Sequence, residues 1–476
     1  MASAQTMAAA SGPSQSADVP RGVARGASIA IDPHAAGASA GREKFLPLTR
    51  AALLDRLTQP ANWAAGEASE ARRFMRYLDY WRRHSYTARL IELEQAYEPF
   101  APDSDLKTTR SYSDAERAAM QQRVVSGMAA LLEQGNFTRV RADDVHLILT
   151  EDSHYGLDLH VDLNAFEEAL IFYRGATTRA EQRRDPRRLW LKHKTVEVPV
   201  FQRLFLLFKL KPFDTRVAEV MAQQSVSKRK AEKLVRKARA LLPKSVTNDC
   251  IYMKLFKDMP RTDVEMIFPN TRVKFRRWDK IRFGVSASGG VGMGVFGTIS
   301  KIALLSNPTT LLGTIAAFGG VLARQVSSFV AQRNRYMVVM AQNLYFHSMA
   351  DNRGVMTLLA SRAAEEDMKE EILLYCALAQ GPVPASDIDR IDKTIEAYLK
   401  DTFGLDVDFF MRDALSRLKA DGIVTEVDGM LTTLPPAQAA AHVDRLWDRC
   451  LDDLPDLFPD EGTEVDVSAG AQRSSS

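Results

Sequence analysis

The sequence has little cysteine, and its cysteines are not spaced to hold a metal or a disulfide framework. Cys250, Cys376 and Cys450 lie far apart, and none belongs to a C-x-x-C pair. This spacing argues against structural zinc and fits a reducing compartment. Residues 1–44 also lack the apolar core of a secretory signal peptide. We expect them to be a disordered tail, because they hold too few large apolar side chains to offset the entropy of ordering.

Motifs for nucleotides and cofactors are missing as well. No Walker A lysine motif occurs. Residues 292–297 formally match G-x-G-x-x-G, but a dinucleotide site needs that turn between a strand and a helix, with an acidic residue about 20 positions later. Here the glycines lie inside an uncharged segment, and residues 312–317 contain no acid. The sequence therefore predicts no cofactor.

Acidic and histidine side chains offer two weak candidate sites. Asp158, His160 and Asp162 would share one face of a strand, but residues on one face follow each other at about 6.6 Å and do not converge on one ion. A solvated polar face is the favoured interpretation, so no metal is predicted. Asp263 and Glu265 are the best acidic candidates for catalysis, but we favour a structural role in which they pair with nearby cations. No catalytic residue is predicted.

The net charge of +3 conceals a strong asymmetry along the chain. Between Arg174 and Arg282 there are 29 Lys and Arg residues against 11 Asp and Glu, a local balance of +18 that leaves −15 for the rest. Clustered cations attract anionic lipid headgroups, each contributing about 1 kcal/mol close to a membrane surface. They also attract nucleic-acid phosphates.

Hydrophobic periodicity predicts an α+β fold. Apolar residues at three- and four-residue spacing indicate helix from Phe45 to about Phe100. Ser113, with Glu116 three residues later, predicts the capped start of a second helix that ends near Gly135. Segments rich in β-branched and aromatic residues predict an antiparallel sheet packed on these helices. The predicted strands are 157–163, 169–173, 195–201 and 204–210, followed by a helix with a basic face at 227–242.

Two long uncharged stretches predict a membrane anchor. Residues 283–300 and 302–323 hold 18 and 22 residues without a charge. As helices they would extend about 27 and 33 Å, close to a hydrocarbon thickness of about 30 Å. We therefore predict a transmembrane helical hairpin at residues 281–330, reversed at Asn307-Pro308. The alternatives are a hairpin buried in a soluble core and a re-entrant hairpin.

Basic residues flank this hairpin on both sides, at 274–282 and 324–335. The positive-inside rule then places both termini in the cytoplasm. The expected localisation is a bacterial inner membrane, or the mitochondrial inner membrane if the protein is eukaryotic. Anionic lipid headgroups are the expected membrane partner, because the basic block lies next to the hairpin.

The C-terminal part is predicted to be a winged-helix-like module. We expect a helical connector at 331–365 that continues to about Met349 and breaks at 351–354. Helices at 368–379, 386–402 and 408–421 and a hairpin turning at Asp428-Gly429 then follow in the winged-helix order. The module is assigned to residues 366–450, and residues 451–476 are an acidic loose tail.

The predicted third helix of this module does not suit a nucleic-acid groove. Residues 408–421 carry three cations and three carboxylates, so the segment has no net charge. A groove-binding face should be basic. We therefore expect a protein partner, of unknown identity, and no nucleic-acid partner.

Several short stretches resemble the transmembrane protein 143-like family, which is defined by a domain of unknown function numbered 3754. The matching stretches are Phe172–Gly175, Val196–Arg203, Lys254–Pro260, Asp263–Met266 and Leu344–Phe346, with Asp351, Asn352 and Gly354 after them. The resemblance covers roughly residues 150–380. It implies a two-helix membrane protein without an established biochemical activity. The family-motif residues, of unknown role, are Arg174, Gly175, Arg203, Asp263, Glu265, Asp351, Asn352 and Gly354.

The sequence thus predicts an α+β body at residues 45–280, a transmembrane helical hairpin at 281–330 and a C-terminal winged-helix-like module. The favoured function is a membrane-anchored scaffold or interaction protein of unknown biochemical activity and oligomeric state. One alternative is a membrane-tethered nucleic-acid-binding protein, and the other is an enzyme of unrecognised type that uses Asp263 and Glu265. In the nucleic-acid alternative, the phosphate contacts would come from Lys228, Arg229, Lys233 and Arg236.

Overall fold

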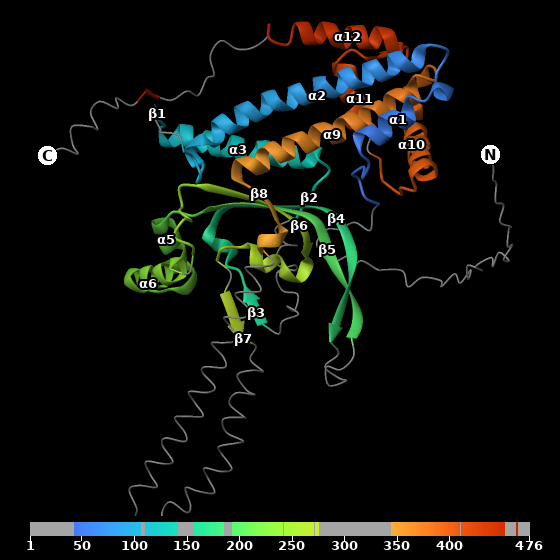
Figure 1. The fold of residues 1–476 in the computed structure, drawn as a ribbon. Coiled ribbons are helices and arrows are strands. Elements are labelled where there is room, and N and C mark those ends of the chain that lie inside the picture. The colour runs from blue at the N-terminus through green and yellow to red at the C-terminus, as the bar shows by residue number, and fades with distance from the viewer. Residues whose placement is uncertain are drawn as a thin grey trace, which may run out of the picture.

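Most of the helices form one layer of the molecule, antiparallel strands form a second, and two further helices lie beside the sheet (Figure 1). The structure is a computed structural model, and it describes residues 42–105, 110–140, 157–184, 193–240, 242–270, 272–275, 344–409, 411–452 and 463–464. The α-helices are α1 (Arg50–Leu57), α2 (Glu67–Tyr97), α3 (Asp114–Gln134), α5 (Phe213–Gln224), α6 (Lys228–Arg239), α9 (Asn352–Leu378), α10 (Ile388–Phe403), α11 (Met411–Ala420) and α12 (Pro436–Asp448). Short 3₁₀ helices are η1 (Pro60–Asn62), η2 (Glu98–Phe100), η3 (Leu163–Ala165), η5 (Arg261–Ile267) and η6 (Ala385–Asp387).

The strands build an α+β fold with antiparallel sheets, as the periodicity predicted. They are β1 (Arg110–Ser111), β2 (Thr138–Arg139), β3 (Leu157–His160), β4 (Phe166–Arg184), β5 (His193–Leu210), β6 (Ile251–Pro260), β7 (Arg272–Phe275), β8 (Ser348–Asp351), β9 (Val383–Pro384), β10 (Val424–Val427), β11 (Met430–Thr433) and β12 (Thr463–Glu464). The main sheet has the order β2-β4-β5-β6-β8, and each neighbouring pair is antiparallel.

Strands β4 and β5 are much longer than predicted, with 19 and 18 residues. The two segments predicted at 195–201 and 204–210 are one continuous strand. β6 pairs with β5 only between Val200 and Lys209. Beyond that point β4 and β5 pair with each other and project from the sheet as a two-stranded ribbon (Figure 1). In the β4 half of this ribbon, residues 178–184 contain one apolar side chain, Ala180, so this half lacks the apolar alternation that a half-buried strand requires.

The two faces of the sheet bury different apolar side chains. Phe172 and Phe205 face α2, α3 and α9 and are completely buried in the core between helices and sheet. Tyr173 and Leu204, one position along each strand, belong to the core on the opposite face, which η5 helps to cover. This is the period of two expected when both faces of a sheet are covered.

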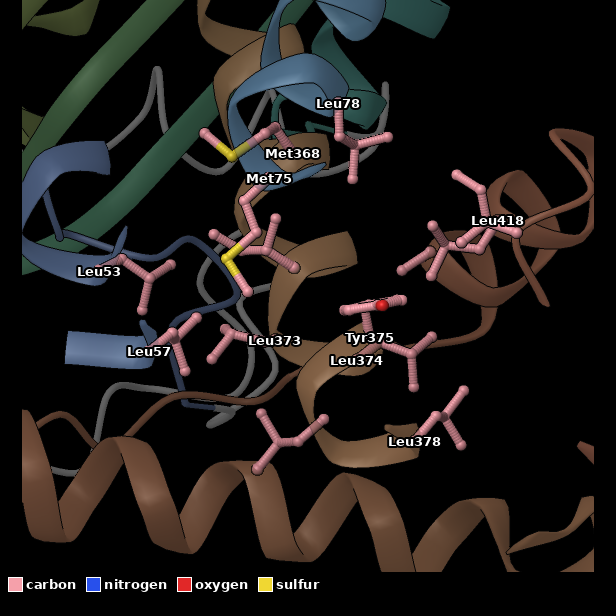
Figure 2. Packing of buried hydrophobic residues seen from close by; sticks show 14 of the residues in the cluster. Leu53, Leu57, Met75, Leu78, Met368, Leu373, Leu374, Tyr375, Leu378 and Leu418 are labelled. Atoms are coloured by element: carbon pink, nitrogen blue, oxygen red, sulfur yellow. The ribbon is translucent and has the colours of Figure 1, made fainter. Parts of the chain in front are cut away.

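Helix α9 connects two cores. Its first half, including Leu359, packs with the sheet, α2 and α3. Its second half packs with α1, the first half of α2 and the C-terminal module around Met368 and Tyr375 (Figure 2). Tyr375 is completely buried against Phe74 of α2, with ring centroids 4.4 Å apart. The N-terminal helices and the C-terminal module therefore share one core although they lie at opposite ends of the sequence.

The helix cap, the helix end and the hairpin turn that were predicted from neighbouring residues are confirmed. The Ser113 hydroxyl accepts from the Glu116 amide at 3.3 Å, and a Glu116 carboxylate oxygen accepts from the Ser113 amide at 2.7 Å. Helix α3 ends at Gly135, as predicted. The predicted hairpin turn at Asp428-Gly429 has φ angles of 53° and 73°, which are the positive values that a two-residue type I′ turn needs.

The C-terminal elements follow the predicted order of helix, helix, helix and hairpin. The structure adds β9, which pairs with β11 to complete a three-stranded sheet. It also adds α12, which packs on α2 (Figure 1). The predicted helix break at 351–354 is wrong, because Asp351 ends strand β8 and Asn352 begins α9. Helix α9 continues without interruption across residues 365 and 366, where the connector was predicted to end.

The predictions of a transmembrane hairpin at residues 281–330 and of an integral-membrane localisation are contradicted and are corrected here. In the ranges that the structure describes, no helix is both long enough and apolar enough to cross a membrane. The long helices α2 and α9, with 31 and 27 residues, carry charged side chains along their length. Residues 276–343, which include the predicted hairpin, lie outside the described residues. A stretch without charges is a weaker indication of a membrane span than a stretch of large apolar side chains. Six of residues 283–300 are glycine, so this stretch is uncharged without being strongly apolar.

Candidate functional site

Two of the family-motif residues, Arg174 and Arg203, line one pocket between the sheet and α9. Arg174 on β4 lies directly opposite Arg203 on β5 in the strand pairing. Both belong to the face of the sheet that the helices cover, since Phe172 and Phe205, two positions away, lie in the core with α9. Like charges directly opposite each other across a strand pair are unfavourable. The fold therefore holds two cations together that would otherwise repel each other.

Neither of these guanidinium groups forms an ion pair with a described residue. Arg174 donates to the Gly135 carbonyl at 3.0 Å, and Arg203 donates to the Gln202 carbonyl at 2.7 Å. Arg174 also lies between two aromatic rings, with its Cζ 4.5 Å from the Phe45 centroid and 4.9 Å from the Phe137 centroid. Such stacking fixes the orientation of the guanidinium plane without neutralising its charge.

Burial lowers the pKa of Arg174. Glu366 opposes this effect, while the positive charges of Arg203 and Arg362 lower the pKa of Arg174 further. The shift thus reports both the low polarity around this side chain and the presence of two more guanidinium groups. Arg362 comes from α9 and lines the same pocket.

The α9 side of the pocket is already paired internally. Arg362 contacts Glu365 at 3.0 Å, and Lys369 contacts Glu366 at 2.6 Å. Lys369 also donates to the Leu46 carbonyl at 2.7 Å, while Glu366 accepts from the Leu46 amide at 3.0 Å. The cavity of about 260 Å³ is thus lined by four cations and two carboxylates. Of these cations, Arg174 and Arg203 have no carboxylate within ion-pair distance among the described residues.

A segment before α1 closes one side of this pocket. Residues 45–49 line it, and Glu43 just before them accepts from the Ala176 amide on β4 at 3.0 Å. The carbonyl of Glu43 accepts from the Asp408 amide at 2.8 Å, and Arg42 pairs with Glu396 at 2.8 Å. The segment therefore ties the sheet to the C-terminal module across the pocket. No local sequence signal marks these residues, because all their partners are distant in sequence.

Gly175 follows Arg174 and has a structural reason to be glycine. Its φ is +70°, and a Cβ atom would lie 2.6 Å from the Gln202 side chain. Both the positive φ and the close approach exclude an ordinary side chain without strain. The Gln202 side chain therefore packs against Gly175.

A buried ionic network lies on the other side of α9. Arg417 of α11 contacts Glu371 at 2.6 Å, Glu370 at 3.1 Å and Asp367 at 3.2 Å. Arg82 of α2 donates to Glu371 at 2.8 Å and pairs with Asp421. The three α9 carboxylates are at most 5% exposed. This network joins α2, α9 and α11, which belong to different parts of the chain.

Burial has the largest effect on the pKa values of the three carboxylates in this network. It raises the pKa of Glu370 to about 8, against the opposing charge of Arg417 and a hydrogen bond from Asn136. Burial also raises the pKa values of Asp367 and Glu371. The pKa of Arg417 is raised, because its three carboxylate partners outweigh the effect of its burial. The network is therefore sensitive to pH in the range where Glu370 titrates.

The remaining family-motif residues do not converge on the arginine pocket. Asp351 pairs with Lys254 at 3.0 Å, and Asn352 accepts from the Met253 amide at 3.1 Å, so both fasten the start of α9 to β6. Gly354 lies in the first turn of α9. Asp263 is buried in η5, which also contains Glu265. Their positions fit structural roles at the ends of strands and helices.

The histidine and aspartate residues near β3 are also separate from the pocket. Asp158 and His160 are in β3, which pairs with β7, and Asp162 pairs with Arg216 at 2.9 Å. Among the residues that the structure describes, no group of three or more His, Cys, Asp or Glu side chains could hold a metal ion.

Comparison with known proteins places the pocket partly within a recognised sequence family. Residues 166–354 match the model of the family described as Protein of unknown function (DUF3754). The match supports a domain of unknown function and includes both Arg174 and Arg203. It does not confirm the transmembrane protein 143-like name or the two membrane helices that the resemblance implied. No solved structure matches this chain.

Proposed function

We propose that this protein is a binding protein whose ligand carries a phosphate group, bound in the pocket beside Arg174 and Arg203. The observation that carries the proposal is the pair of guanidinium groups opposite each other on β4 and β5, neither of which pairs with a described carboxylate. An anion between them would remove their repulsion and supply the missing partner.

A phosphate suits these side chains for geometric reasons. The planar fork of a guanidinium matches two oxygens of a phosphate or carboxylate at once. Arg174 is held rigidly between Phe45 and Phe137. Arg362 can supply a third guanidinium from α9 because it lines the same cavity. The cavity volume of about 260 Å³ favours a small ligand, since sites for drug-sized molecules start at about 300 Å³.

The proposal keeps the interaction role expected from the sequence but moves it away from the winged-helix-like module. In that module, α11 directs Arg417 toward the α9 carboxylates, and Asp421 just after α11 pairs with Arg82 of α2. Trp81 of α2 also donates to Asp421 at 3.2 Å. The end of the helix that would face a partner in a winged helix is thus occupied by contacts within the chain.

Thermal unfolding of the full-length chain in inorganic phosphate tests the proposal. We expect the Tm to rise with phosphate concentration and to follow a saturable curve, because a ligand that binds only the folded state stabilises it by about 2.7 kcal/mol at a concentration 100 times its Kd. The reference series uses sodium chloride at matched ionic strength. An equal rise in chloride would show that the effect is general screening and would refute phosphate binding.

Substitutions in the pocket test whether phosphate raises the Tm by binding there. Arg203→Gln should remove the response to phosphate while leaving the protein at least as stable without it, because one of two repelling charges is lost. Arg390→Gln is the matched control, since Arg390 is an exposed arginine of α10 that pairs only with Asp387 among the described residues. If Arg203→Gln kept the full response, the pocket would not be the binding site.

A further inference from the structure

Helices α5 and α6 form a helix-turn-helix unit at one edge of the molecule. They are joined by three residues, and the first of these, Ser225, has a φ of 49° that turns the chain sharply. Val217 and Val220 of α5 pack on Ala231 and Val235 of α6 in a small core of their own. Figure 1 shows the pair apart from the layer of α2, α3 and α9. Two helices joined by a turn of three or four residues are the unit that places a second helix in a DNA groove.

The outer surface of α6 is strongly basic. Its 12 residues include seven Lys or Arg and one Glu. Ala231 and Val235 face α5, and the helix exposes six cations. Arg229, Lys233, Arg236 and Lys237 lie on the side away from α5, while Lys228 and Lys230 are exposed in the first turn. Arg236 lies 3.5 Å from Glu232. In the described part of the chain, the other five exposed cations of α6 have no carboxylate within ion-pair distance.

The first turn of α6 places its charges unfavourably for the helix itself. Lys228, Arg229 and Lys230 occupy this turn, which contains no acidic residue. The amino end of a helix carries a partial positive charge, so cations there oppose helix formation. By contrast, α5 has Asp214 in its first turn. The cations of α6 are thus not explained by helix stability, and they lie at the end of the second helix that faces bases and phosphates in helix-turn-helix complexes.

Interactions on the inner side hold the unit firmly on the sheet. Arg216 of α5 pairs with Asp162 at 2.9 Å, and Glu219 pairs with Lys211 at 2.6 Å. Arg239, in the last turn of α6, donates to the Lys211 carbonyl at 2.6 Å. Glu219 and Arg239 of the unit are therefore engaged toward Lys211 at the end of β5, while five exposed cations of α6 have no carboxylate partner among the described residues. Such a rigid and asymmetric arrangement suits recognition of an anionic surface.

We propose that α6 is the recognition helix of a DNA-binding surface and enters the major groove of double-stranded DNA. A helix of 12 residues is about 18 Å long, and the major groove of B-DNA, about 12 Å wide, admits one. Double-stranded RNA is disfavoured, because its major groove is too narrow for side chains to read. This inference departs from the expectation of no nucleic-acid partner, which rested on the C-terminal module and on a membrane role for the basic block.

Fluorescence anisotropy of the full-length chain with a labelled DNA duplex of about 20 base pairs, two helical turns, tests the proposal. The variant replaces Lys228, Lys230 and Lys233 with Gln. We expect at least tenfold weaker binding at about 50 mM salt, and a slope of log K against log salt that is smaller by about 2 to 3 because three phosphate contacts are lost. Circular dichroism should show unchanged helix content.

The matched control is a second triple variant with the same loss of charge. It replaces Arg390, Lys393 and Arg412 with Gln, and these exposed cations lie on α10 and α11 of the C-terminal module. This variant should bind DNA as tightly as the unmodified chain. The proposal is overturned if the unmodified chain does not bind at low salt, if both triple variants weaken binding equally, or if an RNA duplex of the same sequence binds equally well.

Discussion

Two helical segments of this protein are both rich in charged side chains, which are buried in one segment and exposed in the other. Between Glu366 and Glu371, α9 carries five charged side chains that are at most 5% exposed. Helix α6 carries seven cations, six of which are exposed. Three of the α9 carboxylates contact Arg82 of α2 or Arg417 of α11, and Glu366 pairs with Lys369. Most of the α6 cations, by contrast, lack a described carboxylate partner. The density of charged residues along a helix therefore does not reveal whether their side chains are buried or exposed.

The comparison also shows what each kind of charge contributes. Removal of a charge from water is costly unless it is paired and hydrogen-bonded, and the contacts of Arg417 and Arg82 satisfy that requirement in α9. Because these partners come from distant parts of the chain, the network permits one relative placement of α2, α9 and α11. Among the described residues, five exposed cations of α6 have no such carboxylate partner and remain available to an external anion.

The largest expected effect comes from breaking the network. Arg417→Met leaves three buried carboxylates without their shared partner, so the free energy of unfolding should fall by about 3–5 kcal/mol in urea denaturation. Arg412→Met on the same helix removes an exposed cation, and should change it by no more than about 0.5 kcal/mol. Similar losses for the two variants would mean that the network contributes no more than a surface charge.

The next largest effect should be a pH dependence of stability that arises from the buried carboxylates of α9 and not from the exposed charges. The pKa of Glu370 is raised in the folded state from its ordinary 4.5 to about 8, so the folded chain binds more protons than the unfolded chain between these values. The free energy of unfolding should therefore fall as pH rises from about 4.5 to about 8. Between these two pKa values the fall is about 1.4 kcal/mol for each pH unit. Urea denaturation across this range measures it.

Glu370→Gln should flatten that dependence and make the protein more stable than the unmodified chain at the upper end of the range. Glu426→Gln is the control, because Glu426 is 42% exposed and pairs with Lys419 on the surface. A flat pH profile of the unmodified chain, or an unchanged profile in Glu370→Gln, would contradict a protonated Glu370 at neutral pH.

The smallest expected effect is an increase in the free energy of unfolding, caused by substitutions in α6. Replacing Lys228 and Lys230 with Glu puts acidic residues at the amino end of the helix and should raise the free energy of unfolding by about 0.3–1 kcal/mol each. Lys237→Glu, near the carboxyl end of the same helix, should lower it by a similar amount. If Lys228→Glu and Lys230→Glu destabilised the protein, the α6 cations would have a structural role and the contrast with α9 would disappear.

Much of the secondary structure could be predicted from the sequence, because its signals are short-range. The capping box at Ser113 and Glu116 and the hairpin turn at Asp428-Gly429 each involve residues within four positions of one another. The prediction failed where the signal depended on surroundings. The uncharged stretches at 283–300 and 302–323 were interpreted as a membrane hairpin, and the outer part of β4 had no apolar alternation to reveal it.

The candidate site was predictable only as a set of residues. Arg174 and Arg203 stood out through resemblance to a family, but their opposition depends on the register between β4 and β5, which the sequence does not show. Helix α5 was missed, so α6 was interpreted as an isolated basic helix rather than as the second helix of a unit. Arg362 and the segment around Leu46 had no signal of their own, because they reach the pocket only through tertiary contacts.

The sequence by itself determined the approximate extents of α3, α6, α10 and α11, the antiparallel character of the sheet and the concentration of cations between Arg174 and Arg282. Local hydrogen bonds, periodicity and composition are properties of neighbouring residues. Tertiary structure alone decided which charges are buried. Tyr86 and Asp367 are 281 positions apart, yet the Tyr86 hydroxyl donates to the Asp367 carboxylate at 2.6 Å. A charge can leave water only where such partners meet it, and the chain brings them together only when it folds.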